Sequence, residues 1–159
     1  AVGIIAFIAA AAAVGLWVAG RRLPALAAGI AAGATSLPVS FGTALPALDQ
    51  LWMTPRIVAA VEAARPCDDA VLVTSTYREP SLVFAYGPYT TLLVDGSDAV
   101  AAQMTQDRSC AVALIEAHET EAFLARAAEL GLTLRAADVV EGTNYSNGDA
   151  QVLTVYVPG

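Results

Sequence analysis

Residues 1–20 read AVGIIAFIAAAAAVGLWVAG, an uncharged apolar run of twenty residues. At a helical rise of about 1.5 Å per residue, such a run crosses a hydrocarbon layer about 30 Å thick. Two arginines, Arg21 and Arg22, follow it, and a second uncharged stretch extends from Leu23 to about Leu48. The sequence therefore predicts two transmembrane helices, at about residues 1–20 and 23–46, joined as a hairpin.

The second span is less regular than the first, because it carries prolines and hydroxyl side chains that favour a kink or an early end. These residues are Thr35, Ser36, Pro38, Ser40, Thr43 and Pro46. A cleaved signal peptide is the alternative interpretation of residues 1–20, but its basic residues would precede the apolar core, and here they follow it. The chain starts with Ala1 inside an apolar run, so we expect it to be the tail of a larger polytopic protein.

Charge divides the chain into two parts. Of its 159 residues, 57% are hydrophobic and 14% are charged, and all fifteen acidic residues lie in residues 49–159, together with six of the eight basic ones. This acidic balance excludes a basic nucleic-acid-binding protein, so no nucleic-acid partner is expected. Because cytoplasmic loops are enriched in Arg and Lys, we expect the Arg21–Arg22 loop in the cytoplasm and residues 49–159 on the extracytoplasmic side of the lipid bilayer.

From residue 49 onward, short β-rich runs alternate with helical ones, a pattern typical of parallel βαβ units. Helices are expected at residues 54–64, 79–86, 97–105 and 120–130, and strands at 70–74, 91–94, 110–116, 132–140 and 152–157. Thr54 and either Ser97 or Asp98 are expected to cap helix N-termini. The last two strands are expected to form an antiparallel hairpin whose loop contains Asn147-Gly148. The sequence thus predicts a small three-layer α/β domain with a mixed, mostly parallel sheet.

The two cysteines, Cys67 and Cys110, each precede a predicted strand. If those strands are parallel neighbours, the two sulfur atoms meet at the same edge of the sheet, and a disulfide is expected in an extracytoplasmic domain. Two separate buried thiols are the alternative. There is no CxxC or Cys/His spacing, so neither a metal site nor redox catalysis is predicted.

His118 is the only histidine, and it lies with Glu116 and Glu119 at the carboxyl end of a predicted strand, where open α/β sheets bind ligands. It is a candidate ligand or general base. The alternative is a solvated first helical turn, in which the helix dipole favours acidic side chains. The sequence contains no GxSxG, GxGxxG or GxxxxGK[ST] motif, so no catalytic residue is assigned.

Two segments concentrate polar groups at bends: YREPSLVF at residues 77–84 and EGTNYSNG at 141–148. Backbone geometry alone also explains them, because Glu is favoured at helix N-termini and Asn-Gly in turns. Asn144-Tyr145-Ser146 matches the N-glycosylation sequon, a short pattern of low specificity.

The two apolar spans, the small α/β domain, YREPSLVFAYG (77–87) and EGTNYSNG together resemble the C-terminal end of bacterial polytopic glycosyltransferases. This group includes relatives of the dolichyl-phosphate-mannose protein mannosyltransferases and of the aminoarabinose lipid A transferases. The likeness covers nearly the whole chain, with Thr143 standing where the family motif has an aromatic residue. It implies an inner-membrane enzyme that transfers a sugar from a polyprenyl-phosphate donor to an extracytoplasmic acceptor, with inversion.

The resemblance places the catalytic acid of such enzymes in an early extracytoplasmic loop, outside residues 1–159. We therefore expect a C-terminal fragment that lacks the catalytic residues and holds no cofactor, with any divalent metal belonging to the full-length enzyme. The α/β domain would act as an accessory cap or select the acceptor. Its candidate substrate contacts are Tyr77, Arg78, Glu79, Asn144, Tyr145 and Asn147.

Two other functions remain open. The chain is alternatively a membrane-anchored binding or assembly module whose α/β domain recruits a partner without catalysis. A small anchored hydrolase is the third hypothesis, and it requires His118 to act as a base beside a nucleophile that the sequence does not identify.

Overall fold

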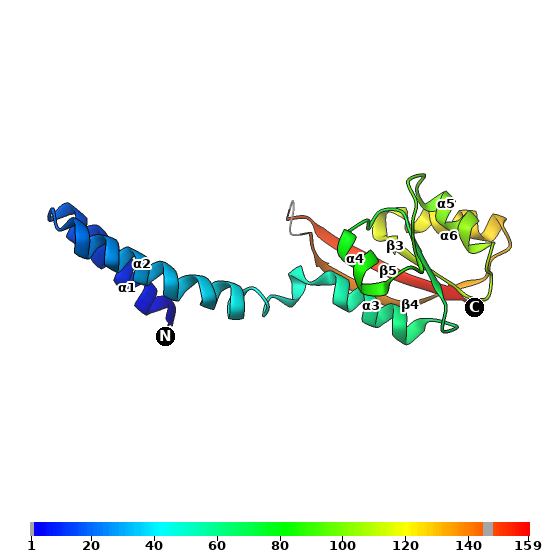
Figure 1. Ribbon diagram of the computed structural model, residues 1–159. Helices are drawn as coiled ribbons and strands as arrows, with labels where there is room; N and C mark the ends of the chain where they lie inside the picture. The colour runs from blue at the N-terminus through cyan, green and yellow to red at the C-terminus, as the bar shows by residue number, and fades with distance from the viewer. Residues whose placement is uncertain (1, 145–147) are drawn as a thin grey trace. The chain divides into compact units, whose positions relative to one another are not determined.

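The computed structural model describes residues 2–144 and 148–159, and the chain divides into two compact units, Ala1–Asp49 and Gln50–Gly159. The first unit consists of apolar helices, and the second combines helices with a five-stranded sheet (Figure 1). The predicted order of N-terminal helices followed by an α/β domain is therefore confirmed.

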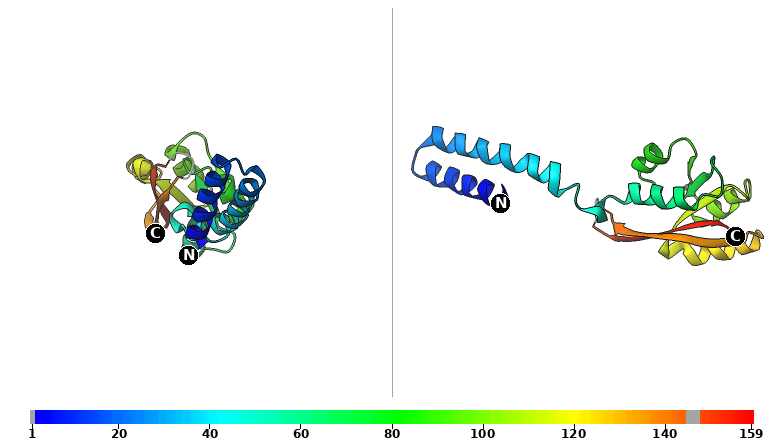
Figure 2. Two further views of the ribbon diagram at one scale, coloured as in Figure 1. Left: turned by 90° about the vertical axis from the view of Figure 1, so that its left-hand side faces the viewer. Right: turned by 90° about the horizontal axis from the view of Figure 1, so that it is seen from below.

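The first unit is an antiparallel pair of helices, α1 (Val2–Val18) and α2 (Arg22–Val39), which run alongside each other in both views of Figure 2. Small side chains lie between them, and Ala6, Ala25 and Ala32 are buried. Helix α1 ends two residues before the predicted boundary, because Gly20 adopts a φ of +75° in the turn that leads into α2.

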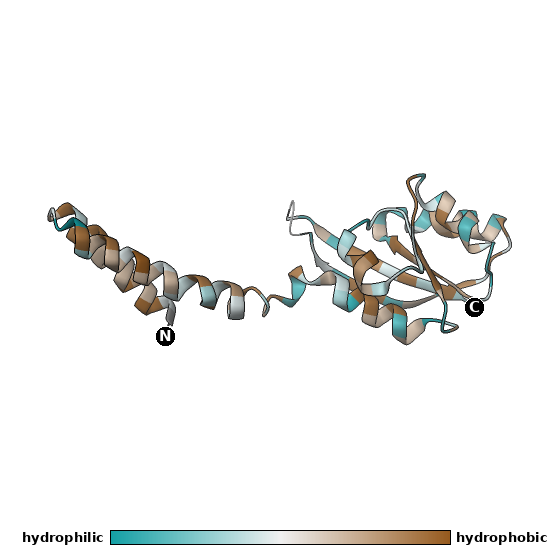
Figure 3. Cartoon of the chain, viewed as in Figure 1, coloured by the Kyte–Doolittle hydropathy of each residue, from teal (hydrophilic) through white to brown (hydrophobic). Residues whose placement is uncertain are grey.

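Helix α2 loses its regular α-geometry earlier than the predicted residue 46. Pro38, which has no N–H, lies in its last turn, and a single π-helical turn, η1 (Ser40–Ala44), follows. Hydroxyl groups bond within the helix, since Thr35 Oγ1 donates to the Ala31 carbonyl at 2.9 Å and Thr43 Oγ1 to the Val39 carbonyl at 2.6 Å. Within the described residues, Arg22–Ala44 is the one helical stretch long and apolar enough to cross a membrane, and α1 is a shorter apolar helix (Figure 3).

The second unit is built on a mixed sheet with the strand order β2-β1-β3-β5-β4. Its strands are β1 (Val71–Thr74), β2 (Thr90–Leu92), β3 (Ala111–Glu116), β4 (Leu134–Thr143) and β5 (Ala150–Pro158). Strand β1 pairs in parallel with β2 and β3, whereas β5 is antiparallel to both β3 and β4. The mixed sheet is as predicted. Two of its strand pairs are parallel and two are antiparallel, so the sheet is mostly parallel only in the sense that most of its strands run in one direction.

Helices cover both faces of this sheet, which gives three layers (Figure 2). The helices are α3 (Met53–Ala64), α4 (Pro80–Tyr86), α5 (Ser97–Met104) and α6 (Thr120–Glu129). Side chains alternate along each strand: Leu72 of β1 packs with α3 and α4, and its neighbour Val73 packs with α5 and α6. The crossovers β1-α4-β2 and β2-α5-β3 therefore lie on opposite faces.

Three local predictions are wrong. Helix α3 begins at Met53 after Trp52, so Thr54 lies within the helix, and Gly96 precedes α5, so neither Ser97 nor Asp98 caps it. The β4–β5 ladder continues to the pair Thr143↔Ala150, well beyond the predicted strand ends. Residues 141–143 are therefore strand and not loop, because they pair with β5.

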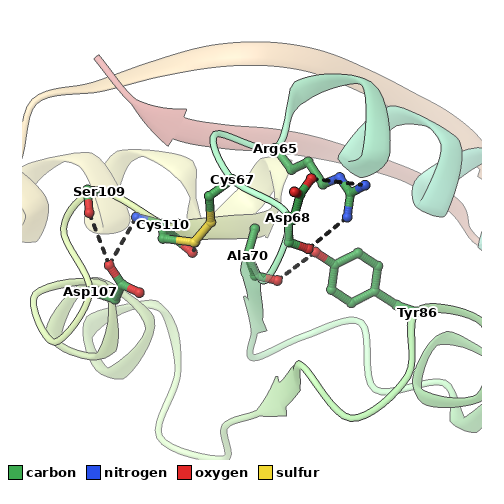
Figure 4. Close-up of a disulfide and its surroundings, with 8 residues drawn as sticks. All are labelled: Arg65, Cys67, Asp68, Ala70, Tyr86, Asp107, Ser109 and Cys110. Atoms are coloured by element: carbon green, nitrogen blue, oxygen red, sulfur yellow. Dashed lines mark hydrogen bonds and ion pairs between the residues drawn. A yellow bond between two sulfur atoms is a disulfide. The ribbon is translucent and has the colours of Figure 1, made fainter.

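The structure joins Cys67 and Cys110 in the disulfide that the sequence predicts (Figure 4). Their Cα atoms lie 5.7 Å apart, because β1 and β3 are parallel neighbours and both cysteines precede them. Two hydrogen bonds order the surrounding loops: Tyr86 Oη donates to the Ala70 carbonyl at 2.6 Å, and the Cys110 N–H donates to Asp107 Oδ1 at 3.1 Å.

Candidate functional site

The two polar segments of the sequence meet in space. Tyr77–Glu79 links β1 to α4, and Glu141–Asn144 forms the end of β4 and the start of the hairpin loop. Tyr77 and Glu79 of the first and Thr143 and Asn144 of the second line one small cavity. The fold thus brings together segments that α4, β2, α5, β3 and α6 separate in the sequence. We call them the paired segments.

The first turn of α3 holds the Tyr77–Glu79 segment. Thr54 is buried, and its Oγ1 lies 3.0 Å from Tyr77 Oη and 2.7 Å from Ser81 Oγ in the first turn of α4. Either oxygen of each pair can donate. The Tyr77 ring is also buried, so its hydroxyl helps to fix the segment in place.

The same helical turn holds the Glu141–Asn144 segment by close packing. A Cβ atom at Gly142 would lie 2.5 Å from Met53 Cγ and 2.9 Å from the Gln50 carbonyl oxygen, so only glycine fits without displacement. Strand β4 therefore lies directly against the start of α3.

A hydrogen bond adds to this contact. Arg56 Nη1 donates to the Glu141 carbonyl oxygen at 2.6 Å. Strand β4 is an edge strand, and this bond ties its end to α3. Met53, Thr54 and Arg56 together anchor both paired segments on one turn of helix, which directly follows the first residues of the α/β unit.

A groove of about 340 Å³ lies beside the second segment. It is lined by Gln50, Arg56, Glu141, Gly142, Thr143, Ala150, Gln151 and Val152. It shares Thr143 and Gln151 with the small cavity, so polar groups continue from one to the other. We call this space the hairpin groove.

The candidate contacts differ in their placement. Glu79 and Asn144 line the cavity, whereas Tyr77 is buried and holds the first segment in place. Arg78 is exposed and has no hydrogen bond or ion pair within the part of the chain that the structure describes. Tyr145, Asn147 and the sequon residue Ser146 lie outside the described residues.

Backbone hydrogen bonds join the two ends of the loop between β4 and β5. The Asn144 N–H donates to the Asp149 carbonyl at 2.9 Å, and the Gly148 N–H donates to the Asn144 carbonyl at 2.8 Å. Gly148 adopts a φ of +81°, which glycine accommodates without strain.

His118 lies elsewhere, at the carboxyl ends of the parallel strands. Its side chain is 64% exposed and its Nδ1 is 3.6 Å from Glu116 Oε1, whereas Glu119 accepts a hydrogen bond of 2.9 Å from Ser75 Oγ. Among residues 2–144 and 148–159, no hydrogen bond joins His118 to a hydroxyl or thiol group, so the geometry favours the solvated-turn interpretation. The described residues also contain no group of three or more His, Cys, Asp or Glu side chains that could hold a metal ion.

Comparison of the chain with protein-family models, curated proteins and solved structures found no match. A functional assignment therefore depends on the paired segments, the hairpin groove and the apolar helices.

Proposed function

We propose that this chain serves in an integral-membrane glycosyltransferase that transfers a sugar from a polyprenyl-phosphate-linked donor to an extracytoplasmic acceptor. The observation that carries the proposal is the meeting of the paired segments on one turn of α3, because these are the segments in which the sequence resembles that class of enzyme. The α/β unit acts as an accessory domain that covers the donor or selects the acceptor. The catalytic acid comes from outside residues 1–159.

The surface of the first unit supports a membrane location. Its large apolar side chains are exposed along both helices and the π-helical turn, which in water would be unfavourable and in lipid is favourable. They include Ile4, Ile5, Phe7, Ile8, Val14, Trp17, Leu23, Leu26, Ile30, Leu37 and Phe41. We place both α1 and α2 across a bacterial inner membrane as a hairpin.

Charge and disulfide chemistry support one orientation of that hairpin. The only charged residues of the apolar helices and their turn, Arg21 and Arg22, favour a cytoplasmic turn. The Cys67–Cys110 disulfide favours an oxidising compartment for the α/β unit. We therefore propose a periplasmic location for this unit.

The covalent link between the two units is short. Residues 45–49 separate the π-helical turn from Gln50, and five extended residues span at most about 18 Å. The paired segments are anchored to α3, which begins three residues after Gln50. Chain length thus keeps them within reach of the membrane surface, where the phosphate of a lipid-linked donor lies.

Arg78 is suited to that phosphate. Its exposed guanidinium makes no ion pair within the described residues, and its donors match two phosphate oxygens. Glu79 and Asn144 line the small cavity where the paired segments meet, and they carry a carboxylate and an amide, which are groups that hydrogen-bond sugar hydroxyl groups.

Transfer kinetics of the membrane protein that contains this chain test the proposal. We expect Arg78→Ala and Asn144→Ala each to lower kcat/KM for transfer from the polyprenyl-phosphate donor, at unchanged stability. Arg135→Ala is the matched control, since Arg135 is an exposed arginine of β4 without an ion pair in the described structure. Unchanged kinetics in both test variants would show that the paired segments do not contact the substrates.

A binding module without catalysis is the second candidate. One observation favours it: the hairpin groove offers hydrogen-bonding groups within the α/β unit, which is what a binding module needs. A membrane protein that binds donor or acceptor without turning either over would establish this function in place of the transferase.

A further inference from the structure

We propose that the hairpin groove binds one neutral sugar unit, and does not bind a phosphate group. This inference rests on the proposed function and deepens it, because it assigns the sugar of the donor or acceptor to a defined site. The groove lies entirely within the α/β unit, between the start of α3 and the end of the β4–β5 hairpin.

The groove is built on regular backbone. The β3–β5 pairing ends at Glu116↔Leu153, whereas the β4–β5 ladder continues to Thr143↔Ala150. The outer part of the hairpin therefore extends past β3. Gln151 pairs with Gly142 across this ladder, so no cross-strand side chain stands opposite its amide.

Three side chains of the groove have hydrogen-bonding capacity that the described part of the protein does not use. The amides of Gln50 and Gln151 and the hydroxyl of Thr143 form no hydrogen bond with any part of the chain that the structure describes. Each amide has two N–H donors and a carbonyl acceptor, and the hydroxyl can donate and accept. Sugar hydroxyl groups, which also donate and accept, match this mixture.

The charges of the groove are unfavourable for an anion. Among the described residues that line it, Arg56 is the one cationic side chain, and its Nη1 already donates to the Glu141 carbonyl oxygen at 2.6 Å. The Glu141 side chain lies at the same rim, and Glu79 lines the adjoining cavity. A phosphate site needs cations or N–H donors that are free to approach the oxygens, so a neutral ligand fits better.

The size of the groove indicates a small ligand. Its volume of about 340 Å³ is at the lower end of the range of about 300–1,000 Å³ that is typical of small-molecule sites. One sugar unit matches this size, and the lipid chain of a donor would require a larger apolar surface.

Side-chain amide NMR spectra of the full chain in detergent micelles test the inference. Methyl α-mannopyranoside is the neutral probe and inorganic phosphate the anionic one. We expect the mannoside to shift the Gln50 and Gln151 amide signals saturably, and phosphate to leave them unchanged. Gln151→Leu should weaken mannoside binding about tenfold, whereas Gln106→Leu on the other side of the fold should not.

Gln106 is a suitable control because it lies just after α5, which covers the opposite face of the sheet from α3, and its amide bonds with Gln103. Thr143→Val, which keeps the side-chain shape and removes the hydroxyl, provides a second groove variant if Gln151→Leu does not fold. Shifts with phosphate but not with the mannoside would overturn the inference, and so would the absence of shifts with both probes.

Sugar transfer from a polyprenyl-phosphate donor, measured separately on the membrane protein that contains this chain, distinguishes the two proposals. Transfer without a mannoside shift would overturn the sugar site alone. A mannoside shift in a protein without transfer would overturn the transferase proposal while supporting the sugar site.

Discussion

Thr54 Oγ1 lies 3.0 Å from Tyr77 Oη, and both side chains are buried. This contact joins the first turn of α3 to the loop after β1, and Ser81 Oγ, at 2.7 Å from the same Thr54 oxygen, extends it to α4. Thr54 therefore links the start of α3 to the first paired segment and helps to fix the position of that segment.

We predict that Thr54→Val lowers the free energy of unfolding by about 1–3 kcal/mol, because it removes the buried Thr54 hydroxyl group and its hydrogen bonds to Tyr77 and Ser81 while preserving the side-chain shape. Urea unfolding of the oxidised chain measures this change. Thr54→Ser keeps the hydroxyl and should lose clearly less. Equal stability of the valine variant and the original chain would show that the contact contributes nothing.

Gly142→Ala tests the close approach of β4 to α3. The new Cβ would lie 2.5 Å from Met53 Cγ, so we expect a loss of about 1–3 kcal/mol through displaced packing. The melting temperature of the α/β unit is the measurement. In Gly33→Ala, where the added Cβ meets nothing within 4 Å, that temperature should not fall. A stable Gly142→Ala variant would contradict the packing described here.

The disulfide should contribute strongly to stability. Cys67 and Cys110 are 43 residues apart in the sequence, and in the chain-entropy model a loop of that length corresponds to about 4 kcal/mol. Denaturant unfolding of Cys67→Ala/Cys110→Ala should show a loss of this order. The same unfolding curve with and without the disulfide would contradict the prediction.

Tyr86 should make stability decrease at high pH. Burial raises the pKa of Tyr86 above its usual value near 10, the Glu62 carboxylate raises it further, and Arg65 lowers it. The unfolded chain then loses the proton first, so the stability contribution is complete below pH 10 and is lost as the pH rises through the folded-state pKa. Unfolding curves between pH 8 and 11 should show a smaller decrease in Tyr86→Phe. Tyr89→Phe is the control. If Tyr86→Phe loses as much stability between pH 8 and 11 as Tyr89→Phe does, Tyr86 is not the source of the decrease.

Much of the fold follows from local patterns. The apolar run before Arg21, the strand–helix alternation from residue 49 and the positions of Cys67 and Cys110 predict the helices, the three layers and the disulfide. The helices and strands depend on periodicity, which neighbouring residues determine. The disulfide also depends on β1 and β3 being parallel neighbours, which the sequence left as a condition.

The candidate site was only partly predictable. The sequence indicated Glu79 and Asn144 as polar residues at bends, but not that Thr54, Met53 and Arg56 hold their segments together. Those contacts depend on tertiary packing between distant elements. Gly142 was the available signal, because a glycine within a strand often marks the close approach of another backbone.

The most direct test of the central claim is a kinetic double-mutant cycle between the paired segments. Sugar transfer from the polyprenyl-phosphate donor is measured for the membrane protein that contains this chain, with Glu79→Gln, Asn144→Ala and both changes together. If the paired segments form one site, each single change lowers kcat/KM and the double variant loses less than the product of the two effects. Multiplicative losses, or no loss in any variant, would contradict the proposal that the segments act as one site.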